Sequence, residues 1–136
     1  MYNYFMNLKD ILKEKNCSII ASNGYVSFDA GIRPVIDRLN EDLYYFKGLS
    51  VADKIIGKAS AMLLCLSGVK EVYAAVLSKA GQEIFEKYNV RYEYGELVDY
   101  IINRKGDGMC PMEMTVRDID DLKEAYEALN RKITLH

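Results

Sequence analysis

The fold of this chain is decided by the stretch Ser18-Ile19-Ile20-Ala21-Ser22-Asn23-Gly24-Tyr25-Val26-Ser27-Phe28. Two short runs rich in β-branched and aromatic residues flank Asn23-Gly24, and Asn-Gly is a dipeptide that two-residue type I′ hairpin turns prefer. The pattern therefore predicts two antiparallel strands, Ser18–Ser22 and Tyr25–Phe28, joined by a tight turn.

Helical patterns lie on both sides of this hairpin. Before it, apolar residues recur at three- and four-residue intervals and predict a helix over Tyr4–Lys15. After it, a short helix is expected over Pro34–Asn40, because proline is favoured in a first helical turn. The aromatic stretch Tyr44–Gly48 reads as a connection or a short strand.

The centre of the chain predicts a buried helix over Ser50–Leu66. Ser50-Val-Ala-Asp53 is an N-terminal capping pattern. A helical stripe follows, made of Val51, Ile55, Ala59, Met62 and Leu66. Ser67-Gly68 ends this helix, and the unbroken apolar run Val72–Leu77 is typical of a strand that is covered on both faces.

Helical and strand patterns also alternate in the last third of the chain. We expect a helix over Lys79–Tyr88, a strand over Val90–Glu93, a helix over Leu97–Ile102, a loop over Lys105–Met114 and a final helix from Thr115 to Ile133. The apolar stripe of the final helix fits either the core of this chain or a dimer seam. A hairpin followed by helix and strand units predicts an α/β fold with a mixed sheet between layers of helices, in one domain over residues 1–136.

Composition excludes several classes of function. The 136 residues carry 18 basic and 20 acidic side chains, without a basic cluster, so a nucleic-acid partner is not expected. No apolar run approaches the length that spans a membrane. Asn3 and Asn7 stand where a secretion signal needs an apolar block, and the expected location is therefore the cytoplasm.

Histidine and cysteine usage narrows the chemistry. The single histidine is His136, which disfavours Ser-His-Asp and Cys-His catalysis and histidine-based zinc sites. The three cysteines are widely spaced and form no C-x-x-C pair. Cys17 and Cys65 are interpreted as small core residues, whereas Cys110 stands in a loop-like context and is the one candidate for a reactive thiol.

Four motifs carry a resemblance to a known family. They are Asp53-Lys54-Ile55-Ile56-Gly57-Lys58-Ala59, Val76-Leu77-Ser78, Asn103-Arg104 and Cys110-Pro111-Met112-Glu113. Over roughly Asn16–Leu129 the chain resembles the family called domain of unknown function 1893, whose fold is similar to that of the cytidine deaminases. The resemblance implies a cytidine-deaminase-like, three-layer α/β/α fold.

The metal ligands of a zinc deaminase are missing from the corresponding positions. Such enzymes need a His/Cys-x-Glu and a Pro-Cys-x-x-Cys at two helix starts. Here these positions read Val51-Ala52-Asp53-Lys54 and Leu77-Ser78-Lys79-Ala80-Gly81, and Cys110-Pro111-Met112-Glu113 comes two helices too late. We therefore predict no metal site, no cofactor and no zinc-dependent deamination.

The resemblance still implies a pocket into which two helix N-termini point, and helix N-termini attract anions. Lys54 and Lys58, spaced i, i+4, and Lys79 at the second helix start would add positive charge. A phosphate-bearing ligand such as a nucleotide is the expected partner. Asp53 would orient a ribose hydroxyl or act as a base.

The candidate residues fall into two groups, each with an ordinary structural alternative. The catalytic candidates are Asp53, Lys54, Cys110 and Glu113, and the ligand-binding candidates are Lys58, Gly57, Ser78 and Lys79. Asp53 and Ser78 also suit helix capping, and the lysines suit a solvated helix face. Gly57, inside the expected helix, indicates close approach by a backbone or a ligand. Cys110 with Glu113 reads as a thiolate and its acid/base partner, or as a turn that packs methionines on the core.

Two functions from different classes follow. The first is a domain or enzyme that binds a small molecule, with Asp53, Lys54 and Lys58 at its site. The second is a catalytically silent deaminase-like module that acts through a homodimer or another protein partner.

Overall fold

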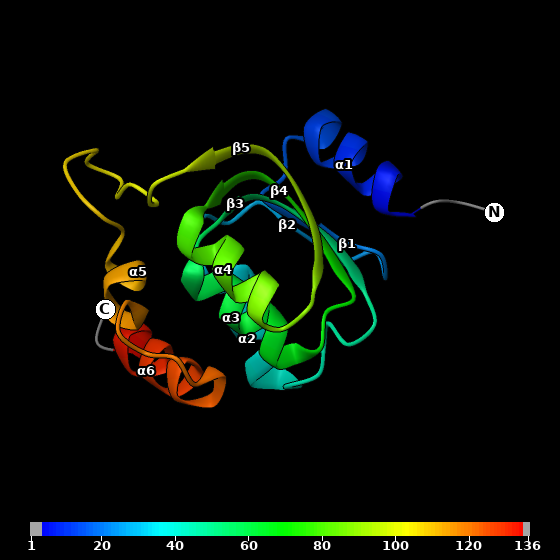
Figure 1. Cartoon of the computed structure of the whole chain (residues 1–136). Coiled ribbons are helices and arrows are strands. Elements are labelled where there is room, and N and C mark those ends of the chain that lie inside the picture. Colours follow the sequence, from blue (N-terminus) through cyan, green and yellow to red (C-terminus); the bar gives the residue numbers. More distant parts are fainter. Residues whose placement is uncertain (1–3, 135–136) are drawn as a thin grey trace.

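The computed structural model of the chain describes residues 4–134 (Figure 1). His136 lies outside these residues. No helix among residues 4–134 is long and apolar enough to cross a membrane.

Five strands form one mixed sheet in the order β2-β1-β3-β4-β5. They are β1 (Ile19–Ala21), β2 (Val26–Ser27), β3 (Ser50–Ile56), β4 (Glu71–Ser78) and β5 (Arg91–Val98). The predicted antiparallel hairpin is confirmed, because β1 pairs antiparallel with β2. The predicted type I′ turn is wrong: Ala21 O accepts from Gly24 N at 3.0 Å, and Gly24, with a φ of 96°, has the left-handed conformation whereas Asn23 does not. β1 also pairs antiparallel with β3, whereas β3, β4 and β5 are parallel.

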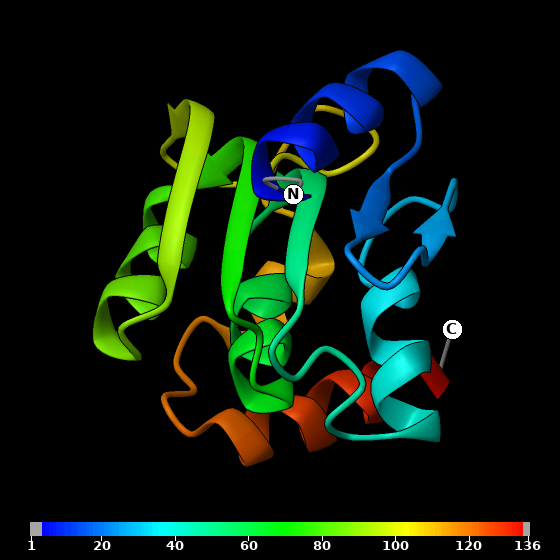
Figure 2. The same cartoon turned by 90° about the vertical axis from the view of Figure 1, so that its right-hand side faces the viewer.

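Helices cover both faces of this sheet (Figures 1 and 2). They are α1 (Tyr4–Lys15), α2 (Arg33–Glu41), α3 (Lys58–Ser67), α4 (Lys79–Lys87), α5 (Pro111–Val116) and α6 (Leu122–Thr134). α1 lies on one face, α2, α3 and α4 lie on the other, and α5 and α6 pack on α3 from outside. The expectation of a mixed α/β fold is thus confirmed, as are the helix over Tyr4–Lys15 and the strand over Val72–Leu77.

The central strands are buried on both faces, and this explains their apolar sequence. Val51 of β3 belongs to the large core beneath α2, α3 and α4. The next residue, Ala52, belongs to a smaller core beneath α1, together with Leu8 and Leu12. Since successive side chains of a strand point to opposite faces, a strand between two helix layers needs apolar residues at nearly every position.

The predicted helix over Ser50–Leu66 is wrong in its first half. Ser50–Ile56 is the central strand β3, and only Lys58–Ser67 is helical. Gly57 separates the two elements and is the residue before the first turn of α3. Ser50 and Asp53 consequently form no capping box, and Lys54 and Lys58 do not share a helix face. The predicted end at Ser67-Gly68 is confirmed, with Gly68 in the left-handed conformation.

The expectations for residues 90–121 also need correction. The strand expected over Val90–Glu93 continues to Val98, so the helix expected over Leu97–Ile102 does not form. The loop expected over Lys105–Met114 ends in the short helix α5. Thr115 lies within α5 and does not cap the final helix, which begins at Leu122.

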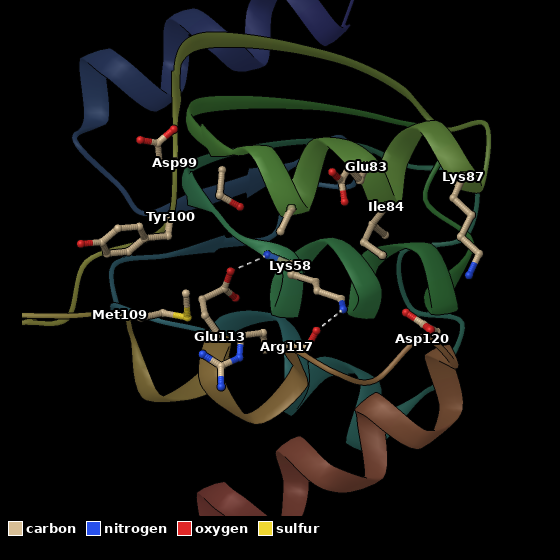
Figure 3. A pocket seen from close by; sticks show the side chains of 12 residues that line it. Lys58, Glu83, Ile84, Lys87, Asp99, Tyr100, Met109, Glu113, Arg117 and Asp120 are labelled. Atoms are coloured by element: carbon tan, nitrogen blue, oxygen red, sulfur yellow. Dashed lines mark hydrogen bonds between the residues drawn. The ribbon is translucent and has the colours of Figure 1, made fainter.

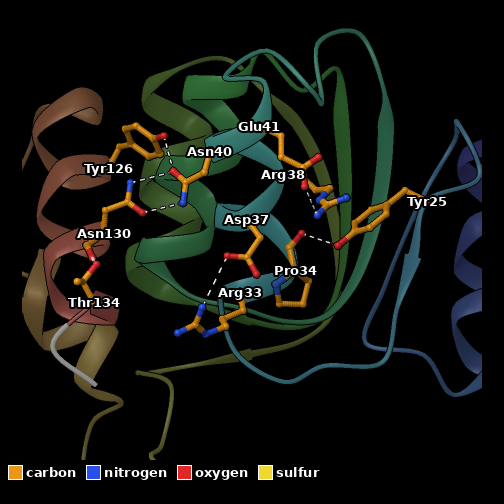
Figure 4. A network of polar contacts seen from close by, with 10 residues as sticks. All are labelled: Tyr25, Arg33, Pro34, Asp37, Arg38, Asn40, Glu41, Tyr126, Asn130 and Thr134. Atoms are coloured by element: carbon orange, nitrogen blue, oxygen red, sulfur yellow. Dashed lines mark hydrogen bonds and ion pairs between the residues drawn. The ribbon is translucent and has the colours of Figure 1, made fainter.

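The final helix packs within this chain. Ala125 and Leu129 of α6 are fully buried in the large core. The face of α6 that carries them therefore packs within this chain and is not available to a dimer interface. A network of side-chain hydrogen bonds joins α6 to α2 (Figure 4). In it, the side-chain amides of Asn40 and Asn130 donate to each other and the Tyr126 hydroxyl donates to Asn40 Oδ1 over 2.5 Å.

Candidate functional site

A pocket of about 250 Å³ lies where the parallel strands β3 and β4 end and the helices α3 and α4 begin. Its walls are α4 on one side and α5 with the following residues on the other (Figure 3). Ser78, Lys58 and Glu113 form its inner part, with Ile84 as an apolar neighbour. The carboxyl ends of parallel strands are a common place for ligands in α/β proteins.

Two glycines let the starts of α3 and α4 approach each other. A Cβ atom on Gly81 would lie 3.1 Å from the carbonyl carbon and oxygen of Gly57. A Cβ atom on Gly57 would fall on the Glu113 carboxylate, 2.7 Å from its Oε2 and closer to its other atoms. The expected close approach at Gly57 is therefore made by Gly81 and by the Glu113 side chain.

Glu113 satisfies the first N–H groups of α3. Its Oε1 accepts from Lys58 N at 2.6 Å and its Oε2 accepts from Ala59 N at 2.8 Å. Only 8% of the residue is exposed. Burial raises the pKa of the Glu113 carboxyl, whereas the two N–H groups and the Lys58 charge act to lower it. The positive end of α3, where an anionic ligand was expected, is thus occupied by a carboxylate of the same chain.

Lys58 ties α3 to the residue that follows α5. Its Nζ donates to the backbone carbonyl of Arg117 over 3.0 Å, and the half-buried side chain crosses the floor of the pocket (Figure 3). The predicted ligand-binding lysine therefore lines the pocket and also holds one of its walls.

Ser78 and Lys79 stand at the start of α4. The Ser78 hydroxyl accepts from Gly81 N at 3.0 Å, so the expected capping role is observed, and the same residue lines the pocket. Lys79 does not line the pocket; its Nζ lies 2.8 Å from Asp99 Oδ1, in an exposed ion pair. Asp99 does line the pocket, so Lys79 contacts a residue of the site without lining it.

Asp53 lies inside the sheet, away from this pocket. It pairs with Ile19 of β1 and Ala74 of β4, and its Oδ1 accepts from Ile55 N at 3.1 Å. Only 7% of the residue is exposed. Burial raises the pKa of the Asp53 carboxyl to about 7, although the backbone N–H groups of Ile55 and Lys54 oppose this shift.

Lys54 and Cys110 also lie outside the group of residues that line the pocket. Lys54 Nζ donates to the backbone carbonyl and to Oδ1 of Asn16, the residue with a positive φ between α1 and β1. Cys110 is half-buried and precedes the first turn of α5. Of the other thiols, Cys17 is fully buried, as expected, and Cys65 is partly buried against the core, where burial raises its pKa to about 12.

Several charged residues of the pocket were not found from the sequence. They are Glu83, Lys87, Asp99, Arg117 and Asp120. Ala80, Ile84 and Lys87 recur at four- and three-residue steps along α4, so they share one helix face, and this spacing could have revealed that wall. Asp99, Arg117 and Asp120 lie outside helices and strands, where no periodicity marks them.

Comparison with known proteins assigns the chain to a family. The family model of a domain of unknown function, DUF1893, matches residues 7–133. This chain belongs to the DUF1893 family. A crystal structure of a DUF1893 family protein from Thermotoga maritima is 27% identical to it and superposes with a TM-score of 0.87, covering 97% of this chain and 92% of that one. No curated protein matches the chain.

In this DUF1893 domain, the buried Asp53 predicts a pH-dependent stability. Its pKa is about 7 in the folded chain against 3.8 ordinarily, so the unfolded chain loses this proton first as pH rises. The free energy of unfolding should therefore fall between about pH 4 and pH 7, by up to about 1.4 kcal/mol per pH unit.

The variant Asp53→Asn keeps the acceptor for Ile55 N and cannot ionise, so it should be more stable than the parent at pH 8 by at least about 1 kcal/mol. Urea unfolding at pH 5 and pH 8 measures this, with the exposed Asp118→Asn as the control. An equal pH dependence in parent and Asp53→Asn chains would contradict the assignment.

The contact of Gly57 with Glu113 predicts coupling between the two positions. Gly57→Ala should lower the free energy of unfolding by about 2 kcal/mol or more, because the added methyl group displaces the Glu113 carboxylate from two N–H groups. In a chain that already carries Glu113→Ala, Gly57→Ala should lower the free energy of unfolding by less than about 1 kcal/mol.

Denaturant unfolding of the four chains gives this double-mutant cycle. Gly108→Ala is the matched control, since a Cβ atom there would meet its nearest neighbour, Asn103 Nδ2, at 3.7 Å. If the double variant loses as much free energy of unfolding as the two single variants together, the residues at positions 57 and 113 do not interact.

Proposed function

We propose that this chain binds a small anionic molecule, of the phosphate-bearing class that includes nucleotides, in the pocket between α4 and α5. The observation that carries this proposal is that three cationic side chains from separate parts of the chain line one pocket. Lys58 comes from α3, Lys87 from α4 and Arg117 from the residue that follows α5. Four carboxylates line the same pocket, those of Glu83, Asp99, Glu113 and Asp120, so the ligand also needs hydroxyl or amine groups. Arginine and lysine are the side chains with which proteins bind phosphate groups.

The charges within the pocket suggest how such a ligand lies. Glu113 and Ser78 are buried residues of the pocket, so hydroxyl or amine groups of a ligand suit its inner end, where the Glu113 carboxylate disfavours an anionic group. Lys87 and Arg117 are exposed and lie on opposite sides of the pocket (Figure 3), so each offers a charged donor to a different part of an anionic ligand. A molecule with hydroxyl groups at one end and a phosphate at the other, as in a sugar phosphate or a nucleotide, meets both conditions.

The size of the pocket limits the ligand. Its volume of about 250 Å³ is just below the range of about 300–1,000 Å³ found for enclosed ligand sites. A compact sugar phosphate fits inside, whereas a nucleotide extends past the rim, where Tyr100 and Met109 offer an aromatic and an apolar surface. The proposal is one of binding; similarity to the cytidine deaminases stays a prediction from the sequence, and no catalytic step is assigned to Asp53, Lys54 or Cys110.

Thermal unfolding with candidate ligands tests the proposal. Ribose 5-phosphate or adenosine monophosphate at millimolar concentration should raise the Tm, and adenosine, which lacks the phosphate, should raise it much less. Lys87→Gln and Arg117→Gln should each weaken binding about tenfold, because each removes a charged donor.

Lys70→Gln is the control, since Lys70 is exposed and does not line the pocket. If phosphate compounds do not shift the Tm, the assigned class of ligand is wrong. If they shift it equally in the parent chain and in the Lys87 and Arg117 variants, the assigned pocket is wrong.

A second candidate function, association with another copy of the chain, is favoured by one observation. β5 is an eight-residue strand at the edge of the sheet, and Tyr94 at its middle is 41% exposed. Edge strands of this kind are templates for pairing with another strand. We propose that two copies join antiparallel through β5.

Light scattering after gel filtration measures the mass. The parent chain should be a dimer at micromolar concentration, and Tyr94→Lys should shift it to monomer, whereas Tyr44→Lys, at another exposed tyrosine, should not. A monomeric parent chain at 100-fold higher concentration would refute pairing through β5.

A further inference from the structure

The short helix α5 makes its polar contacts with the rest of the domain at one place. Among residues 4–134, the polar contacts from residues 111–117 to other elements all end on Lys58 and Ala59. Glu113 accepts from the two backbone N–H groups, and the Arg117 carbonyl accepts from the Lys58 ammonium. Two adjacent residues of α3 therefore hold both ends of α5.

The apolar attachment of α5, which packs on α3 and α6, is small. Besides Glu113, only Val116 of this helix is buried, while Met112 is partly buried and Met114 is 54% exposed. A helix of six residues is far shorter than the length at which helices are stable in isolation. The position of α5 thus depends strongly on the polar contacts that Glu113 makes.

The segments on either side of α5 are irregular, so neither fixes its position through a helix or strand of its own. Residues 99–110, before it, form no helix or strand apart from a single bridge between Ile102 and Met109. Residues 117–121, after it, also lie outside helices and strands. Since Glu113 and Arg117 line the pocket, any displacement of α5 changes the pocket directly (Figure 3).

We infer that α5 is a releasable wall of the pocket and that the Glu113 carboxylate, seated on Lys58 N and Ala59 N, is its latch. With the latch closed, the pocket is narrow and the start of α3 is covered. With the latch open, the pocket widens and those two N–H groups become accessible. That this opening serves ligand entry rests on the proposed function; the latch itself does not.

Hydrogen exchange of backbone amides tests the latch without any pocket ligand. In Glu113→Ala, the Lys58 and Ala59 amides and those of Met114 and Arg117 in and after α5 should exchange at least tenfold faster than in the parent chain. Amides of β4, in the centre of the sheet, should exchange at the parent rate. Asp118→Ala, which removes an exposed carboxylate next to α5, should leave every one of these rates unchanged.

Acetate supplies the missing carboxylate. In Glu113→Ala, acetate at 50–100 mM, on the order of the concentration a weak anion site needs, should slow exchange at Lys58 and Ala59, while chloride at equal ionic strength should not. The parent chain, whose N–H groups are occupied, should not respond to acetate. Glu113→Gln, which keeps the size of the side chain and one carbonyl oxygen, provides a second variant if Glu113→Ala does not fold.

The outcomes separate the latch from other roles. Unchanged exchange in α5 would overturn the inference, and so would an equal acceleration in β4, which would make Glu113 a residue of global stability. An equal acetate effect in the parent chain would show unspecific anion binding and would also overturn it. A failure of phosphate compounds to bind the parent chain would refute the proposed function alone, since these measurements do not involve them.

Discussion

A helix that begins inside a protein needs acceptors for its first N–H groups, and this requirement organises the whole carboxyl edge of the sheet. α3 starts beneath α4 and α5, where Gly57 and Ala59 are buried. The carboxylate that does so comes from Glu113, 55 residues further along the chain from Lys58. Gly57 makes room for that carboxylate, and Gly81 makes room for α4 beside Gly57. Three elements thus meet at one point, and the pocket is the space left between them.

The sequence predicts this fold well wherever one local signal dominates. Asn23-Gly24 marks the hairpin, although its turn is not of the predicted type I′, and apolar spacing gives α1 its bounds. The signal fails at Ser50–Ile56, because a strand buried on both faces is apolar at almost every position and therefore also fits a helical spacing. Val51 and Ile55 happen to continue the stripe of α3, and only Gly57, read as an oddity within a helix, marks the true boundary.

The same boundary explains which site residues were predicted. Lys58 and Ser78 line the pocket because they stand where a strand gives way to a helix, and Glu113 reaches it from α5. Asp53 and Lys54 belong to the strand, so the sheet buries the first and turns the second toward Asn16. Contacts such as that of Lys58 with the Arg117 carbonyl join segments without periodicity, and no local pattern encodes them.

The joints between strand and helix at this edge are unusually short. One residue separates β3 from α3, and none separates β4 from α4. An inserted or deleted residue at either joint would rotate the following helix by about 100° about its axis, since an α-helix has 3.6 residues per turn. Lys58 would then face away from α5, and the register of the whole edge would be lost. Changes in chain length between related proteins should therefore collect in residues 99–110, where the backbone is irregular and largely exposed, and spare these two joints.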